Sequence, residues 1–252
     1  MDRFDVDREA VIQRARDSGV DIIVNIGNGD VAHDSHQDAF RITDQYDFVY
    51  TTAGVHPHEA SLLDDALYKR IAEMSARPKV IAIGEIGLDY HYDHSPREVQ
   101  RQAFRRQLRL ARERDLPAVI HTREAEADTL AILREEWAAA AKPVVIHSFT
   151  GTRHFAEEAV KLGFYISFSG VVTFKSASEL RQSAKTLPAA SILIETDCPF
   201  LTPEPFRGRR NEPAYVVHTA RRIAELRGTT SEEIGRITSE NFMRAFGLES
   251  SR

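Results

Sequence analysis

Short runs of apolar residues alternate with amphipathic segments along the whole chain. Each apolar run has the length of a buried strand, and in the segments between runs apolar residues recur every three or four positions, as on one face of a helix. The predicted strands cover 21–27, 48–55, 79–85, 117–121, 143–147, 164–169 and 191–197. The predicted helices cover 7–18, 30–45, 61–76, 96–114, 125–141, 153–162, 176–186, 213–227 and 231–246.

The regular alternation of strands and helices is typical of a parallel sheet with right-handed crossovers. The length of 252 residues is close to that of one (β/α)8 barrel, about 250 residues. No linker, repeat or low-complexity stretch divides the chain, so we expect a single domain over 1–252. The sequence therefore predicts an α/β fold of the TIM-barrel type. An open doubly wound sheet is the alternative, and it fits less well because reactive residues follow nearly every strand.

The count of predicted strands is one short of a closed barrel, which needs eight. The chain begins with a helix, and no strand is predicted before it. We therefore expect the missing strand to be the first. A barrel without that strand would expose unpaired edges.

Residues able to bind metals follow the predicted strands. They are Glu85, His121, His147 and Asp197. In a parallel barrel the carboxyl ends of all strands open onto one face, where the active site lies. Imidazole and carboxylate groups suit Zn²⁺ or Mn²⁺, and carboxylate-rich sites also take Mg²⁺. Each residue alone could instead be an ordinary polar group in a turn, but four at successive strand ends favour a metal site.

Other polar residues near the strand ends are candidates for contacts with a substrate. His56 could donate a proton to a leaving group or hold a phosphate, whereas His58 could equally belong to a loop stiffened by proline. The planar guanidinium of Arg123 is placed to reach a phosphate oxygen, unless it pairs with a neighbouring glutamate. Lys175 could also serve a substrate phosphate, or be an ordinary solvated lysine.

A basic run at 207–210 follows the last predicted strand. With Phe200 and Phe206 nearby, Arg207 and its neighbours could hold a nucleic-acid strand by charge and stacking. The alternative is a structural loop whose arginines pair with Glu204 and Glu212, and we expect mixed roles. Because the net charge is −5, binding of nucleic acid requires such a local basic patch.

The remaining composition restricts the location of the protein. The single cysteine, Cys198, excludes an internal disulfide and is typical of a reducing cytosol, so we expect a cytoplasmic protein. No histidine is placed as a base for Cys198, so we do not expect it to be a nucleophile. There is no basic, apolar signal segment at the start and no apolar run of membrane-spanning length, so we expect no membrane association.

Six ordered motifs resemble those of the TatD family of metal-dependent deoxyribonucleases. They are GVHPH (54–58), GEIGLDY (84–90), IHTREA (120–125), HSFTG (147–151), ETDCPFL (195–201) and RGRRNEP (207–213). The resemblance implies a TIM barrel with one to three metal ions per chain, Mg²⁺, Mn²⁺ or Zn²⁺. It also implies a 3′–5′ exonuclease that acts on DNA, often on single strands or 3′ ends. We expect the protein to be a monomer.

The resemblance also assigns roles by motif match. It makes Glu85, His121, His147 and Asp197 metal ligands. It gives Asp197 a second role, orienting or deprotonating the attacking water, and places His56 on the leaving-group side. Because family members are also associated with D-aminoacyl-tRNA deacylation, hydrolysis of another ester is the alternative reaction.

The chain departs from the family pattern at its start. The family normally begins with a strand that carries a His-x-His pair of ligands, and this chain has none. Asp5 and Asp7 have the same spacing, but we interpret them as helix-start residues favoured by the helix dipole. We therefore expect a start site placed too far downstream or a truncated chain. A protein that truly lacks the strand would be weakly active or non-catalytic.

Overall fold

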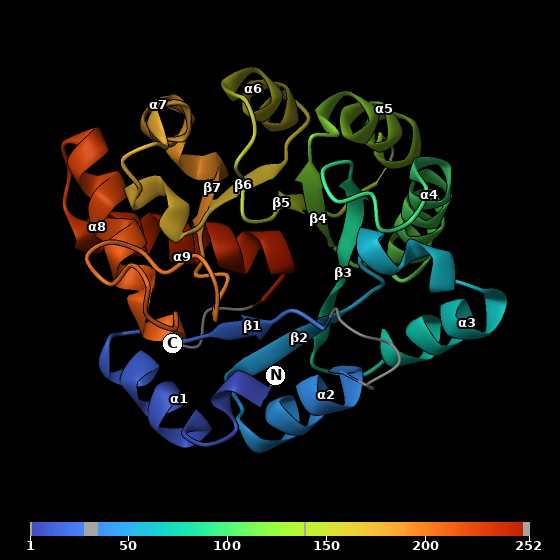
Figure 1. Cartoon of the computed structure of the whole chain (residues 1–252), viewed down its shortest axis with the longest axis horizontal. Coiled ribbons are helices and arrows are strands. Elements are labelled where there is room, and N and C mark those ends of the chain that lie inside the picture. The colour runs from blue at the N-terminus through green and yellow to red at the C-terminus, as the bar shows by residue number, and fades with distance from the viewer. Residues whose placement is uncertain (1, 28–34, 139, 249–252) are drawn as a thin grey trace. The chain divides into compact units, whose positions relative to one another are not determined.

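The computed structural model describes residues 2–27, 35–138 and 140–248. Contacts divide the chain into two compact units. The central unit is the continuous segment Ile22–His147, and the terminal unit combines Met1–Asp21 with Ser148–Arg252. Each unit alternates strands with helices, as Figure 1 shows.

Five parallel strands form the sheet of the central unit. They are β1 (Ile23–Asn25), β2 (Val49–Ala53), β3 (Val80–Asp89), β4 (Ala118–Arg123) and β5 (Val144–Ile146), hydrogen-bonded in chain order. The connections contain α2 (Ser35–Gln45), the 3-10 helix η3 (Pro57–Leu62), α3 (Asp65–Met74), α4 (Arg97–Glu113) and α5 (Glu126–Trp137). Helix α4 packs on β3, its neighbour in Figure 1. Parallel strands joined by helices place the ends of β2, β3, β4 and β5 at one edge of the sheet.

The longest strand, β3, is buried at all ten positions. An apolar stripe on α4, which includes Phe104, Leu108 and Ala111, supplies part of this cover. Gly87 on β3 pairs with His121 on β4, and a Cβ atom at Gly87 would lie 2.0 Å from the carbonyl oxygen of His121. The close approach of β3 and β4 therefore requires glycine at this position.

The only tryptophan of the chain, Trp137, ends α5 in the central unit. Its side chain is buried, and its indole Nε1 donates a hydrogen bond of 2.8 Å to the carbonyl oxygen of Lys142. This bond satisfies the single polar group of a large apolar ring.

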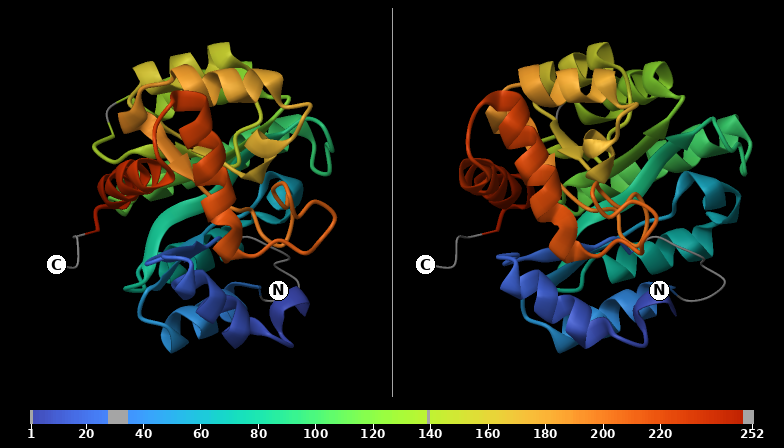
Figure 2. Two further views of the ribbon diagram at one scale, coloured as in Figure 1. Left: turned by 90° about the vertical axis from the view of Figure 1, so that its left-hand side faces the viewer. Right: turned by 60° about the vertical axis from the view of Figure 1, so that its left-hand side comes forward.

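The terminal unit contains two parallel strands, β6 (Tyr165–Phe168) and β7 (Ile192–Ile194). Its helices are α1 (Arg8–Asp17), α6 (Arg153–Lys161), α7 (Ser178–Thr186), α8 (Val216–Arg227) and α9 (Ser231–Phe246), with 3-10 helices η1 (Asp2–Phe4), η4 (Gly170–Thr173), η5 (Ala189–Ser191) and η6 (Pro213–Tyr215). Figure 2 shows α8 and α9 side by side, and the two helices are in contact. From α9, the buried side chain of Asn241 donates to the carbonyl oxygens of Ala189 and Ile192, which fixes the helix against the start of β7.

Two ion pairs connect α1 to the loop that precedes α8. Arg14 forms a double hydrogen bond with the carboxylate of Glu212, and Arg210 forms another with Asp7. Asp7 is the residue before α1, as expected for a helix start, but its carboxylate binds Arg210 and does not cap the helix. Of the two glutamates offered as partners of the basic run, Glu212 forms its paired hydrogen bonds with Arg14, whereas Arg210 of that run pairs with Asp7.

The predicted order of strands and helices is confirmed wherever the structure describes the chain. Two ends differ. Strand β3 continues four residues beyond the predicted end at 85, and residues 57–62 form a 3-10 helix ahead of α3. The first residues of the helix predicted at 30–45, 30–34, lie outside the described part. None of the helices described combines the length and apolarity needed to cross a bilayer.

Candidate metal centre

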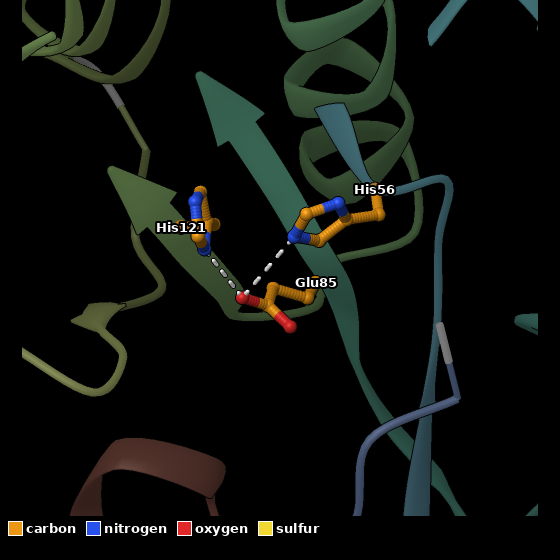
Figure 3. Close-up of side chains that lie close together, drawn as sticks. All are labelled: His56, Glu85 and His121. Carbon is orange, nitrogen blue, oxygen red and sulfur yellow. Dashed lines mark hydrogen bonds and ion pairs between the residues drawn. The ribbon is translucent and has the colours of Figure 1, made fainter. Parts of the chain in front are cut away.

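Two histidine side chains of the central unit, His56 and His121, point toward the carboxylate of Glu85, as Figure 3 shows. The potential ligand atoms of His56, Glu85 and His121 all lie within 4.8 Å of one another. Glu85 Oε1 is 2.9 Å from His121 Nδ1 and 3.8 Å from His56 Nε2. The Nε2 atom of His147, which directly follows β5, lies 3.8 Å from the same oxygen. Three imidazoles thus surround a buried carboxylate, a donor set that suits a divalent metal ion.

Strand geometry positions these groups. The pairing of β3 with β4 shifts register between Ile83 and Ile86, so Glu85 lies at a local irregularity of the ladder. Such irregularities often re-aim a side chain beside an active site. His121 lies one residue after Ile120, which pairs with Ile86 where the regular ladder resumes. Glu85 and His121 therefore meet across neighbouring strands.

His56 precedes η3, and its ring is oriented by the backbone. The backbone N–H of His58 donates a 3.2 Å hydrogen bond to Nδ1 of His56. A neutral imidazole that accepts at Nδ1 carries its proton on Nε2. Burial lowers the pKa of His56 to about 3, although Glu85 opposes the shift. His56 is therefore neutral near pH 7 and presents an N–H group toward Glu85.

Asp89, at the end of β3, orients two histidines. Its Oδ2 accepts hydrogen bonds of 3.0 Å from Nε2 of His121 and from Nε2 of His58. Its Oδ1 accepts from the backbone N–H groups of His91 and Tyr92. Because Nε2 of His121 is hydrogen-bonded to Asp89, only Nδ1 of that ring is left to contact Glu85 or to bind a metal ion. A carboxylate that fixes the far nitrogen of a ligand histidine is a common feature of metal sites.

Opposite charges in the cluster stabilise one another. Burial by itself would lower the pKa of His121, but hydrogen bonds to Asp89 and Glu85 outweigh it and raise the pKa to about 9. Burial would likewise raise the pKa of Glu85, yet the attraction of His147 and His121 holds it well below its usual range. The pKa of Asp89 is also lowered, because the bonds from His121, Tyr92 and His58 exceed the effect of burial. Both carboxylates are therefore ionised near neutral pH.

Aromatic rings extend from the cluster to the surface. The ring of His58 meets those of Tyr92 and His94 edge-on, with centroids 5.4 and 4.7 Å away. The guanidinium of Arg123 lies 4.7 Å from the ring centroid of Tyr92, whose side chain is half exposed. Glu124, one of the glutamates next to Arg123, forms an ion pair with His91.

The structure places the predicted site residues in both units. The central unit holds His56, His58, Glu85, His121, Arg123 and His147, and the terminal unit holds Lys175, Asp197 and Arg207. Lys175 is exposed just after η4, and Asp197 follows β7, two residues after Glu195. Burial raises the pKa of Cys198 to about 11, so its thiol is protonated near neutral pH and is a poor nucleophile, as expected.

Sequence reasoning missed Asp89. Glu85 and Asp89 are four residues apart, and this even spacing places both on one face of a strand. The signal was therefore present, but the predicted strand ended at Glu85. The contacts of His94 and Tyr92 with His58 had no such signal, since they depend on how the loop after β3 folds back.

Comparison with known protein families gives a match over nearly the whole chain. The sequence model of the family "TatD related DNase" matches residues 1–247. A Bacillus subtilis protein named "Uncharacterized metal-dependent hydrolase YabD" is 46% identical over 247 residues, which cover 98% of this chain and 95% of that protein. A Pectobacterium carotovorum protein named "3'-5' ssDNA/RNA exonuclease TatD" is 39% identical over 252 residues, with coverage of 98% and 95%.

Solved structures show the same fold. The TatD homologue YjjV of Escherichia coli superimposes with a TM-score of 0.90 at 30% identity, covering 98% of this chain and 94% of that one. An uncharacterized amidohydrolase of Saccharomyces cerevisiae has a TM-score of 0.81 at 19% identity, covering 95% and 92%. These matches confirm the predicted α/β fold of the TIM-type hydrolase class.

Proposed function

The chain belongs to the TatD related DNase family, a family of metal-dependent hydrolases, and from this premise we propose that it removes nucleotides from the 3′ end of single-stranded nucleic acid. The observation that carries the proposal is the buried carboxylate Glu85 surrounded by His56, His121 and His147. A relative named as a 3′–5′ exonuclease of single-stranded DNA and RNA, similar over 98% of this chain, suggests the substrate.

The donor atoms fit a divalent metal ion. Glu85, His121 and His147 would hold it, and Asp197 is a further proposed ligand from the sequence. Imidazole and carboxylate together favour Zn²⁺ or Mn²⁺, and the share of nitrogen donors makes Mg²⁺ less suited to this cluster. When bound, such an ion polarises a phosphoryl oxygen and lowers the pKa of water.

The protein groups have separate tasks in this proposal. His56 offers its Nε2 proton to an oxygen of the phosphodiester, since its Nδ1 is occupied by the backbone N–H of His58. Asp89 holds the ring of His121 so that Nδ1 faces Glu85. Arg123, the exposed last residue of β4, supplies a planar guanidinium whose paired N–H groups suit a phosphate.

The test is cleavage of an oligonucleotide by metal-stripped protein to which Mg²⁺, Mn²⁺ or Zn²⁺ is returned. A 5′-labelled single strand should shorten stepwise from its 3′ end, and a 3′-terminal phosphorothioate should block the reaction. The variant Glu85→Gln should be inactive, whereas Asp93→Asn, an exposed aspartate paired with Arg97, should be fully active. Turnover of an aminoacyl ester without any cleavage of nucleic acid would instead support the alternative ester hydrolase. A folded protein inactive on both substrates with every metal would contradict the proposal.

A further inference from the structure

We propose that the loop after β7 and the residues after η4 form a surface that binds single-stranded nucleic acid, an inference that rests on the proposed function. We call it the basic-aromatic surface and define it by Phe174, Lys175, Phe200, Arg207 and Arg209. All of these residues belong to the terminal unit. The inference adds a substrate-binding surface to the chemistry proposed for the metal centre.

The arginines of the run at 207–210 are of two kinds. Arg210 is committed to the structure through its paired hydrogen bonds with Asp7. Arg207 and Arg209 are exposed, and within the described part of the chain neither forms an ion pair. Their positive charges are therefore available to an anionic ligand.

Each available guanidinium lies over an aromatic ring. The guanidinium carbon of Arg207 is 3.7 Å from the ring centroid of Phe174, and that of Arg209 is 5.6 Å from the centroid of Phe206. Phe206 is in turn stacked on Tyr215 at 4.7 Å. Stacking holds the long arginine side chains in place, so less conformational freedom is lost when a phosphate binds.

An exposed aromatic ring completes the surface. Phe200 is 54% exposed, so its ring is accessible to a ligand. The guanidinium of Arg3 lies 5.1 Å from its ring centroid. An exposed ring beside cations suits a nucleotide, because the base stacks on the ring and the phosphate binds the cation. A duplex keeps its bases stacked on one another, so this chemistry favours a single strand.

The loop after β7 is held by hydrogen bonds of its own side chains, and it begins beside Asp197, the predicted catalytic aspartate. The buried side chain of Asn211 donates to the carbonyl oxygens of Thr196 and Phe200, and the hydroxyl of Thr202 donates to that of Arg209. Both ends of the loop are therefore fixed at the end of β7, beside Asp197.

The experiment measures binding of fluorescent oligo(dT) by anisotropy, in EDTA so that the strand is not cleaved, over a series of salt concentrations. The double variant Arg207→Gln/Arg209→Gln should make the slope of log K against log salt shallower by about 1.4, about 0.7 for each lost phosphate contact. Phe200→Ala should weaken binding at least about fivefold, and Phe200→Trp should restore it. The control is Lys185→Gln, which removes one positive charge from an exposed position in α7 and should change nothing.

An equal slope for the double variant and for Lys185→Gln, with circular dichroism unchanged, would overturn the inference. Hydrolysis of oligo(dT) with unaltered binding in all of these variants would overturn it while leaving the proposed function intact. Conversely, the expected losses of binding in a protein that cleaves no strand with any metal would support the surface and contradict the nuclease proposal. Comparing the affinity for oligo(U) of the same length with that for oligo(dT) shows whether the surface binds RNA or DNA more tightly.

Discussion

Asp89 orients two histidines of the candidate metal centre through its hydrogen bonds. Both of its oxygens already accept hydrogen bonds, from two histidine rings and two backbone N–H groups. Its side chain is 1% exposed, so the loss of one partner would leave a buried charge poorly compensated. We interpret Asp89 as the residue that selects which nitrogen of His121 is available as a ligand.

The variant Asp89→Asn tests this role. The amide keeps one acceptor oxygen but loses the charge, so His121 is held less firmly. We expect binding of Zn²⁺ or Mn²⁺ to weaken about 10- to 100-fold, as measured by calorimetric titration. Asp93→Asn, in the same loop but exposed, is the control and should bind as the original chain does. Equal affinities in the two variants would remove Asp89 from the metal site.

His56 and His121 should respond differently to substitution. His56 has a neutral ring that presents an N–H group, so His56→Gln should lower kcat by about 10²- to 10⁴-fold with metal affinity unchanged. His121→Gln should lose metal binding itself, because Nδ1 points at Glu85. Calorimetry and oligonucleotide turnover separate the two outcomes, and a parallel loss of metal from both variants would make His56 a ligand.

Residues at strand ends could be predicted from the sequence because an apolar run followed by a polar residue is a local pattern. Glu85, His121 and His147 were found in this way, and the structure brings them together. Asp89 was not, because the predicted strand stopped too early. The orientation of His56 depends on a hydrogen bond from the backbone of His58, which no spacing of residue types reveals.

At the scale of elements, β3 carries the two carboxylates of the site, and its pairing with β4 brings Glu85 next to His121. Its last residues pair in register from Ile86 with Ile120 to Asp89 with Arg123. Periodicity predicted the existence of both strands. It could not predict that β3 continues to Asp89, because that extension is stabilised by β4, which is distant in sequence.

Gly87→Ala should disrupt this pairing. The added Cβ would lie 2.0 Å from the carbonyl oxygen of His121, and φ of +140° is strained for alanine. We expect a loss of about 3 kcal/mol or more in the free energy of unfolding, measured in urea. Gly163→Ala is the matched control, because its φ of +82° is also positive but no atom lies within 4 Å of the added Cβ. That variant should lose only about 1–2 kcal/mol.

At the scale of the molecule, the alternation of strands and helices was enough to predict the fold class. The two compact units had no counterpart in the sequence, since no linker separates them. They are defined by contacts, and the terminal unit joins both ends of the chain. Such a division depends on distant contacts and cannot be found in local composition.

Removal of the metal should destabilise the protein, because an ion that binds only the folded state adds its binding free energy to folding. At a metal concentration of 100 times Kd the gain is about 2.7 kcal/mol. We expect EDTA to lower the melting temperature by roughly 5–10 °C and Mn²⁺ or Zn²⁺ to restore it. Glu85→Gln is the comparison, and its melting temperature should not respond to metal. An equal response of both proteins would place the binding elsewhere.

The buried indole of Trp137 makes the central unit optically distinct. Since the chain has no other tryptophan, emission excited at the red edge of the protein absorption band reports on Ile22–His147 alone. Tyrosines occur in both units, so tyrosine emission reports on the whole chain. If tryptophan fluorescence and circular dichroism show the same thermal transition, the chain melts cooperatively. Separate midpoints would resolve a partly folded species without any added label.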